Sequence, residues 1–358
     1  MKLCYEIFIY IAYVIIKYLP FLVGILLSVA FYTLAERKIM AAMQRRVGPN
    51  VVGFAGVLQP FSDGLKLLLK EFFQPRYAEK KIFWFGPFLM LVVSFIGWLV
   101  IPFSEYGPLL TFKLSLIFLY AVNSLSVYGI ILSGWSSNSK YSFLGALRSA
   151  AQMLSYEVSL GFIFLLIGCA AGSYNLTDIC YVQSETISFF FPLFPIFIVF
   201  YITVLAETNR IPFDLPEAEA ELVAGYNTEY SSMGFTAFFL AEYSNMLLMS
   251  FLIVICFFKG WLGAFGVFSY FLKVLFFSIS LIWVRATLPR YRYDQLMSLG
   301  WKTILPIVIS YFTFFVCFLI FTDRAVFTDG SSALLRLPTR VALEDPILLH
   351  PYLDPRAK

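Results

Sequence analysis

Residues 235–258 read FTAFFLAEYSNMLLMSFLIVICFF, an apolar run in which Glu242 is the only charged residue. About 20 predominantly apolar residues are needed for a helix to cross the hydrocarbon core of a bilayer. Lipid offers no hydrogen-bond partners to a backbone, so a spanning segment must satisfy its own polar groups, as a helix does. The run therefore predicts a membrane-spanning helix.

Comparable runs occur along most of the chain. Hydrophobic residues make up 60% of the 358 residues and charged residues only 13%, whereas soluble domains are about 45–50% apolar. We find no alternating ten-residue pattern of the kind that β-barrel strands show. The further apolar windows are residues 11–35, 83–103, 112–133, 146–171, 189–206, 266–288 and 302–322. We predict an all-α integral membrane protein with eight transmembrane helices, one membrane domain over residues 1–322 and an exposed tail over residues 323–358.

The positive charges are distributed unequally between the loops. Most arginines and lysines follow the first, third, fifth and seventh predicted helices, and the remaining loops carry only Lys113 and Lys259. By the positive-inside rule, the basic loops face the cytoplasm or matrix, and both termini lie on the opposite side. No small-residue cleavage site follows the first window, so we expect it to remain as a span. The net charge of +4 does not indicate nucleic-acid binding.

Residues 59–75, QPFSDGLKLLLKEFFQP, predict a helix of a different kind. Their apolar residues recur at helical spacing: Phe61, Leu65, Leu68, Leu69 and Phe72. Asp63, Lys66 and Lys70 occupy the other face, and Pro60 and Pro75 bound the segment. About 14 residues extend about 21 Å, which is too short to cross a bilayer. We predict an amphipathic interfacial helix between the first and second spans, which either roofs a cavity or anchors the chain to the membrane surface.

Acidic residues gather in residues 207–230, ETNRIPFDLPEAEAELVAGYNTEY, between two apolar windows. Ionisable groups near membrane depth are costly, so such a segment predicts a proton or ion pathway. Asp214 before Pro216 and Glu217 predicts a helix start with a capping box. Along that helix Glu217 and Glu221 share a face and Glu219 points away, so the three do not serve one pocket. Stabilisation of the helix dipole is the structural alternative for these acids.

Two further carboxylates, Glu157 and Glu242, lie inside predicted spans, and Glu207 of the acidic segment directly follows another. Glu157 lies about 13 Å along its helix from Arg148, Glu242 lies seven residues into its own, and Glu207 ends an apolar window. Desolvation disfavours the charged form of a carboxylate, so groups at this depth can take up and release protons near neutral pH. We predict a proton relay, with a structural hydrogen bond between helices as the alternative.

Cationic residues bracket the same side of the membrane. Glu36 and Arg37 end the first predicted helix, Arg46 follows shortly after, and Arg285 and Arg290 lie near the end of the seventh. They either line a cavity together with acidic partners or mark the membrane surface as snorkelling side chains.

The sequence offers no ligand set for a metal or haem. Its cysteines stand singly at positions 4, 169, 180, 256 and 317, and His350 is the only histidine. No CxxC pair or His pair is present, so we expect any redox centre to belong to a partner chain.

Several motifs together resemble subunit 1 of the respiratory NADH:ubiquinone oxidoreductases, complex I, over essentially residues 5–322. They are LAERK (34–38), RRVGPN (45–50), GVLQPFSDGLKLLLKE (56–71), RSAAQMLSYE (148–157), LAETNRIPFDLPEAEAELVAGYNTEYS (205–231), AEY (241–243) and RATLPRYRYDQLM (285–297). The resemblance does not extend to the tail or to the loop between the fourth and fifth predicted helices.

The resemblance implies that the chain forms the membrane end of a ubiquinone chamber. The residues that would border the chamber are Glu36, Arg37, Arg46, Asp63, Arg285 and Arg290. Those that would connect it to a proton path are Glu157, Glu207, Asp214, Glu217, Glu219, Glu221 and Glu242. It further implies that NADH, FMN and iron–sulfur clusters are bound by partner subunits, not by this chain. The partners would be peripheral quinone-module subunits, membrane-arm pump subunits and membrane lipids.

The richness in phenylalanine, 41 of 358 residues, and the lack of a targeting segment are typical of an organelle-encoded chain. We therefore expect the mitochondrial inner membrane, with a bacterial plasma membrane as the alternative. Two other functions stay open at this point. One is the equivalent membrane subunit of an energy-converting hydrogenase, against which RRVGPN and the amphipathic segment argue. The other is an independent cation transporter with the acidic segment as its vestibule.

Overall fold

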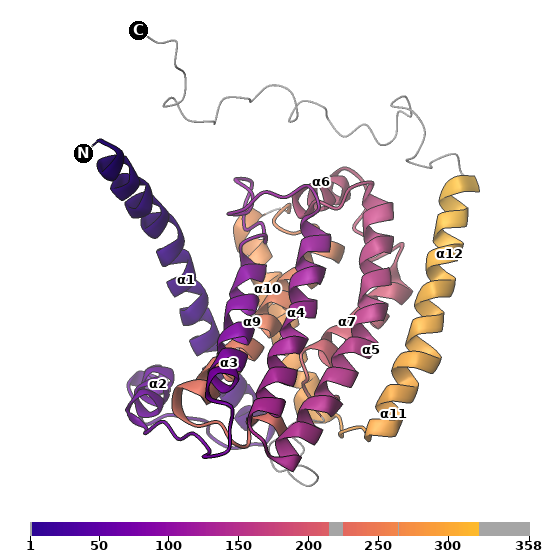
Figure 1. Ribbon diagram of the computed structural model, residues 1–358. Coiled ribbons are helices and arrows are strands. Elements are labelled where there is room, and N and C mark those ends of the chain that lie inside the picture. Colours follow the sequence, from indigo (N-terminus) through magenta and orange to yellow (C-terminus); the bar gives the residue numbers. More distant parts are fainter. Residues whose placement is uncertain (1, 215–224, 264, 322–358) are drawn as a thin grey trace.

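The computed structural model describes residues 2–214, 225–263 and 265–321, with side chains from residue 18 onward (Figure 1). Within these residues every regular element is helical. The long helices are α1 (Lys2–Met43), α3 (Lys80–Trp98), α4 (Ser115–Ser136), α5 (Lys140–Ala171), α9 (Ser232–Phe257), α10 (Gly266–Thr287) and α12 (Leu305–Phe321). The shorter elements are η1 (Phe54–Gly56), α2 (Gln59–Leu69), α6 (Leu176–Glu185), α7 (Phe194–Glu207), η2 (Gly225–Asn227), α11 (Tyr293–Ser298) and the π-helical turn η3 (Leu299–Ile304).

Seven helical segments of the described residues are long and apolar enough to cross a membrane, the last running continuously over Tyr293–Phe321. The expected eighth, residues 189–206, is represented by α7, which has 14 residues and is about 21 Å long. Pro195 stands in the first turn of α7, where a missing backbone N–H costs nothing. Residues 189–193 form turns, and the N–H of Phe190 donates to the carbonyl of Phe257 over 3.2 Å, so the helix begins later than the apolar window does.

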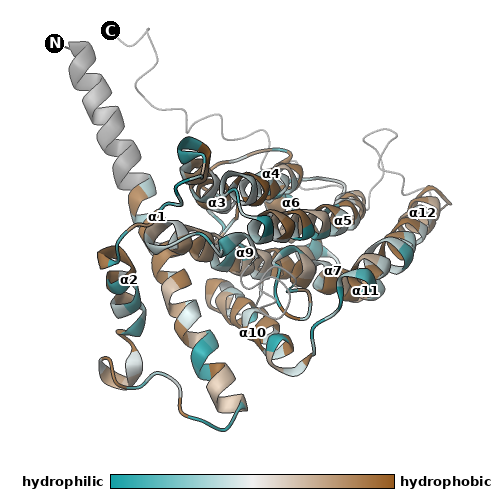
Figure 2. Ribbon diagram, turned by 60° about the horizontal axis from the view of Figure 1, so that its bottom comes forward, coloured by the Kyte–Doolittle hydropathy of each residue, from teal (hydrophilic) through white to brown (hydrophobic). Residues whose placement is uncertain are grey.

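The bundle has a buried centre and an exposed rim. In α9 72% of the apolar window is buried, whereas in the segment containing α12 the share is 11%. A helix that is apolar all round is stable in the centre of a bundle, which explains the place of α9 between α3, α10 and α1. Figure 2 shows hydrophobic residues along most of α10 and α12 at the rim.

The basic loops gather at one end of the bundle. Figure 1 shows α2, the loop between α4 and α5, and the chain between α10 and α11 at the lower end, opposite to α6. This arrangement agrees with the grouping of loops expected from the charge pattern. The acidic segment enters the same end from α7 and leaves it through η2.

The predicted amphipathic segment is helical over a shorter range than expected. α2 ends at Leu69 because Lys70 has extended backbone angles. Beyond it the chain is held by the N-terminus of α9, where the N–H of Phe73 donates to the Ser231 hydroxyl over 2.9 Å. No residue of α2 is buried, and Leu65 and Leu69 are 60% and 86% exposed. Its apolar face is therefore available to lipid or to another chain.

A glycine fixes where the acidic segment returns to the bundle. A Cβ on Gly145 of α5 would lie 2.6 Å from the Cα of Gly225 and 3.0 Å from the N of Tyr226. The backbones of α5 and η2 thus touch, and the Ser142 hydroxyl donates to the Tyr226 carbonyl over 3.4 Å. Small residues permit such close backbone approach between membrane segments.

Gly145→Ala is expected to lower the thermal stability of the chain by several degrees. The added methyl meets backbone that cannot move aside, and overpacking of this kind costs about 1–3 kcal/mol. The midpoint can be followed in mild detergent by the reaction of the buried thiols of Cys180 and Cys256 with a fluorescent maleimide.

Gly24→Ala is the matched control, because a Cβ at Gly24 of α1 would meet nothing within 4 Å. Alanine is also the better helix former. Equal midpoints for the two variants would contradict the close packing of α5 against η2.

Candidate functional site

The loop after α7 is fixed by a buried glutamine. Gln152 of α5 is fully buried, and its Nε2 donates to the carbonyls of Ala206 and Phe213 over 2.9 and 2.7 Å. The N–H of Tyr291 donates to the Pro212 carbonyl over 3.0 Å. Both ends of the loop are therefore tied to α5, and the end near Phe213 is also tied to the chain leading into α11. This fixes the positions of the charged residues on the loop.

Arg210 of this loop meets the predicted intramembrane acid of α9. The buried Arg210 places Nη2 3.4 Å from Oε2 of Glu242, and the Tyr226 hydroxyl donates to Oε1 over 2.6 Å. The guanidinium also lies over the ring of Tyr243, 4.6 Å from its centre. Cation–π contacts of this kind are strongest where water is excluded. Glu242 is thus held by one cation and one hydroxyl.

A second ion pair joins α1 to α10 at the rim of the bundle. Glu36 of α1 is buried and accepts from Nη1 of Arg285 on α10, whose side chain is 20% exposed. Its Oε2 is also buried and has no hydrogen-bond partner among the described residues. A buried carboxylate without a cation would be costly, so each partner of this pair depends on the other.

Two further predicted arginines also have acidic partners. Arg37 of α1 lies 2.6 Å from Asp63 of α2, and both are partly exposed. Arg290 lies 3.4 Å from the buried Asp214 of the acidic segment. The first pair ties α2 to α1, and the second ties the acidic segment to the end of α10.

The other two predicted relay acids lie on facing helices. Glu157 of α5 and Glu207 of α7 are both buried, and the two helices pack against each other. Oε2 of Glu207 has no hydrogen-bond partner among the described residues. Like charges repel strongly where water is excluded, so ionising both carboxylates costs more free energy than ionising one.

An apolar cavity of about 810 Å³ lies between α1, α9 and α10. Along α1 it runs from Pro20 to Ile39, which is about 28 Å of helix. Phe251 of α9 and Phe271 of α10 contribute aromatic walls. Ala35 and Ile282, which line it, precede Glu36 and Arg285 by one and three residues. The cavity therefore extends to the region of the Glu36–Arg285 pair.

Some predicted site residues lie apart from these groups. Arg46 stands in the exposed loop after α1 and donates from Nε to Gln44 over 2.8 Å. Glu217, Glu219, Glu221 and the helix predicted to begin after Asp214 lie outside the described residues. Within the described residues, no group of three or more His, Cys, Asp or Glu is arranged to hold a metal ion.

Sequence reasoning missed Arg210, Gln152 and Tyr226. Arg210 counted only as a marker of loop sidedness, although an arginine directly beside an apolar window signals a buried partner. Gln152 and Tyr226 carry no charge, and their contacts depend on chain segments 54 and 16 residues away. No sequence pattern identifies such partners.

The family described as NADH dehydrogenase matches residues 16–316. A protein of Chondrus crispus named NADH-ubiquinone oxidoreductase chain 1 is 53% identical over 83% of this chain and 94% of its own length. Its counterpart of the same name from Arabidopsis thaliana is 54% identical over 82% of this chain and 92% of its own length. A subunit of the NADH-quinone oxidoreductase of Rhodospirillum rubrum is 50% identical over 82% of this chain and 90% of its own length.

These relatives cover most of the chain at high identity. All three are named as parts of an NADH-ubiquinone or NADH-quinone oxidoreductase, and none of the three is named as a hydrogenase subunit or an independent transporter. The chain therefore belongs to the NADH dehydrogenase family, as a chain 1 member and a multi-pass membrane subunit of the NADH:ubiquinone oxidoreductase complex.

Proposed function

We propose that this chain forms the membrane part of the ubiquinone chamber and couples quinone reduction to proton translocation through its acidic residues. The observation that carries the proposal is the apolar cavity between α1, α9 and α10, which extends to the buried Glu36–Arg285 pair. A ubiquinone has the same two parts, a long apolar tail and a polar ring. The shape and polarity of the cavity match such a molecule.

The cavity supports binding of the tail. Ligand sites are concave, mostly apolar and about 300–1,000 Å³ in volume, and this cavity is about 810 Å³. Its aliphatic and aromatic walls remove tail surface from water. Ser28 and Ser278, the two serines in the lining, donate to the carbonyls of Ile25 and Leu275 of their own helices. Neither hydroxyl proton therefore needs a partner from the ligand.

The charged end supports binding of the ring. Glu36 and Arg285 provide an acceptor and a donor beside the cavity, and Arg37 with Asp63 provides a second pair that holds α2 to α1. We propose that α2 lies in the membrane interface with its exposed apolar face on lipid and roofs the chamber. Electrons would arrive from iron–sulfur clusters of peripheral partner subunits.

The acidic residues support the relay. Reduction of a quinone to a quinol takes up two protons, and their withdrawal changes the charge on nearby acids. In this chain the series runs from Asp214 with Arg290, through Arg210 with Glu242 and Tyr226, to Glu207 and Glu157. We include Glu217, Glu219 and Glu221 in it on their family motif. Moving one charge across 100 mV takes about 2.3 kcal/mol. Changes in the electrostatic free energy of a few buried ion pairs are large enough to supply this energy.

We further propose that α7 is an eighth crossing. Its inner residues are buried against α5, and irregular backbone at membrane depth is tolerated where protein covers it. A short helix inside a bundle thus need not match the full thickness of the bilayer. We propose the mitochondrial inner membrane as the location on the richness in phenylalanine, with a bacterial plasma membrane as the alternative, because the relatives include a Rhodospirillum rubrum protein.

Glu157→Gln and Glu242→Gln are each expected to lower quinone-linked proton pumping by about tenfold or more, because a proton-transfer group is removed. Electron transfer from NADH to ferricyanide, which does not require the quinone chamber, should stay unchanged. Both rates can be measured on the same membrane vesicles.

Glu185→Gln is the matched control, because Glu185 ends α6 at the opposite end of the bundle and is exposed. Normal pumping by fully assembled Glu157→Gln and Glu242→Gln variants would show that these acids are not part of the relay.

Gly24→Leu is expected to raise the KM for a long-tailed ubiquinone by about five- to tenfold, because the new side chain occupies part of the cavity. A short-tailed analogue does not fill the cavity, so its KM should change little. Steady-state kinetics with the two quinones give the comparison.

Leu27→Phe adds bulk to the same helix outside the cavity lining and serves as the control. A rise in KM of equal size for both quinones, or for both variants, would count against tail binding between α1, α9 and α10.

A further inference from the structure

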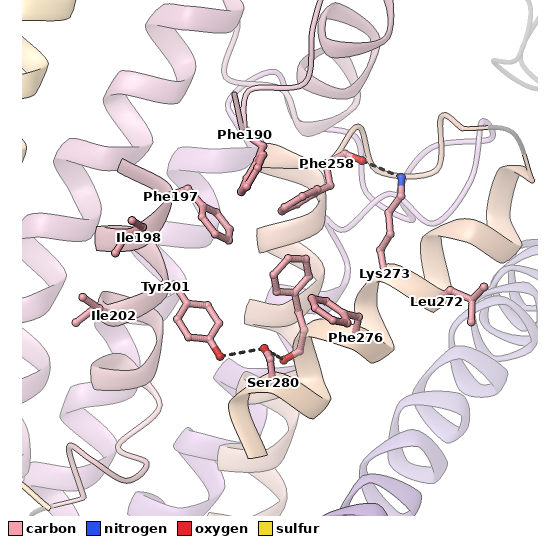
Figure 3. Close-up of a pocket in the computed structure, with 11 residues that line it drawn as sticks. Phe190, Phe197, Ile198, Tyr201, Ile202, Phe258, Leu272, Lys273, Phe276 and Ser280 are labelled. Carbon is pink, nitrogen blue, oxygen red and sulfur yellow. Dashed lines mark hydrogen bonds between the residues drawn. The ribbon is translucent and has the colours of Figure 1, made fainter. Parts of the chain in front are cut away.

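A second cavity lies on the other face of α10. Its volume is about 710 Å³, and it is formed by α7, α10 and the segments before α7 and after α9 (Figure 3). The walls are almost entirely aromatic and aliphatic, including Phe190, Phe197, Phe258 and Phe277. We call this cavity the α7–α10 groove. It is separate from the cavity proposed for the quinone, with which it shares no lining residue.

One end of the groove carries a cation. Lys273 lines the groove, and Figure 3 shows its side chain reaching toward the end of α9. Its ammonium donates to the carbonyls of Phe258 and Gly260 over 2.9 and 3.3 Å. An ammonium has three donors, so one donor remains after these two bonds.

Among the described residues, no acid forms an ion pair with Lys273. Lys259, which has no ion pair there either, stands between Phe258 and Gly260, the two residues whose carbonyls Lys273 binds. The frame around them is rigid, because Gln183 donates to the carbonyls of Ile255 and Cys256 and accepts from the N–H of Lys259. Two cations are thus held at one end of an apolar groove.

The depth of this end suits a lipid headgroup. Lys273 lies seven residues, about 10 Å, along α10 from its first residue, Gly266. Lysines at this depth extend toward the interface. The opposite end of the groove is lined by Tyr201 and Ser280, whose hydroxyls lie 2.9 Å apart. An acyl chain would therefore run along the phenylalanines, with its headgroup at the lysines.

We propose that the α7–α10 groove binds one anionic phospholipid, whose phosphate contacts Lys273 and Lys259 and whose acyl chain packs on the phenylalanine walls. The occupant is anionic because two unpaired cations flank the same end, and it is a lipid because the rest of the lining is apolar. This site lies at the end of the bundle away from the basic loops, so the lipid belongs to the leaflet opposite to them. The inference stands independently of the quinone proposal.

The test uses the assembled complex in detergent, supplied with photoreactive phosphatidylglycerol or with photoreactive phosphatidylcholine of the same acyl chains. The anionic probe should label peptides of α7 and α10, and the zwitterionic probe should label them about tenfold less. Lys273→Gln should lower labelling by the anionic probe about tenfold, whereas Lys273→Arg should retain it. Lys113→Gln, which removes an exposed lysine from another loop at the same end, should have no effect.

Equal labelling of Lys273→Gln and the unmodified complex, or equal labelling by the two probes, would overturn the proposal. So would crosslinks from the groove to a helix of a neighbouring subunit, or displacement of the probe by long-tailed ubiquinone. Ile198→Trp tests the groove without changing the lysine, since Ile198 lines it from α7. It should abolish labelling, and Leu147→Trp on the exposed face of α5 should not. Labelling that survives in Ile198→Trp also overturns the proposal. This second test applies even if the Lys273→Gln complex fails to assemble.

Discussion

The structure depends on one constraint, which is that a bilayer offers neither a hydrogen-bond partner nor a counter-ion. Each charged group at membrane depth must then find its partner within the protein. Glu242 finds Arg210 and the Tyr226 hydroxyl, and Glu36 finds Arg285. These pairs join elements far apart in the chain, 249 residues apart for Glu36 and Arg285. The need to compensate charge therefore also holds the loop end of the bundle together.

The same constraint explains why the acids stand where they do. α9 is the most buried helix of the bundle, and an acid on its surface faces protein, not lipid. Gln152 fixes the loop that carries Arg210 by binding both of its ends, so the cation reaches Glu242 without a helix of its own. Glu207 and Glu157 lie on α7 and α5, the two helices that this glutamine connects. The hydrogen bonds of an uncharged side chain, Gln152, therefore fix the positions of these charged residues.

The apolar composition of the sequence predicted the spanning helices well. It predicted the ends of helices less well, because these depend on local contacts. Seven apolar windows correspond to spanning helices, but the fifth begins with turns and is helical only from Phe194, and the chain leaves α2 early to bind Ser231. For the site, several of the acids and arginines singled out as unusual in an apolar chain form ion pairs with one another. Their pairing was not predictable, because it depends on how α1, α9 and α10 approach one another. The roles of these residues in quinone binding and proton transfer stay predictions.

α10 separates two cavities that differ chiefly in where their charges lie. Phe271, Ser278 and Ile282 line one, and Lys273, Phe277 and Ser280 line the other. The first extends toward an ion pair at the loop end, in which Arg285 is already compensated by Glu36. The second ends at Lys273 and the neighbouring Lys259, neither of which has an acidic partner in the part of the chain that the structure describes. A compensated pair suits a neutral ring that needs a donor and an acceptor, whereas uncompensated cations suit an anion. One helix with similar apolar faces can therefore serve two amphiphiles, because charge balance at opposite ends distinguishes between them.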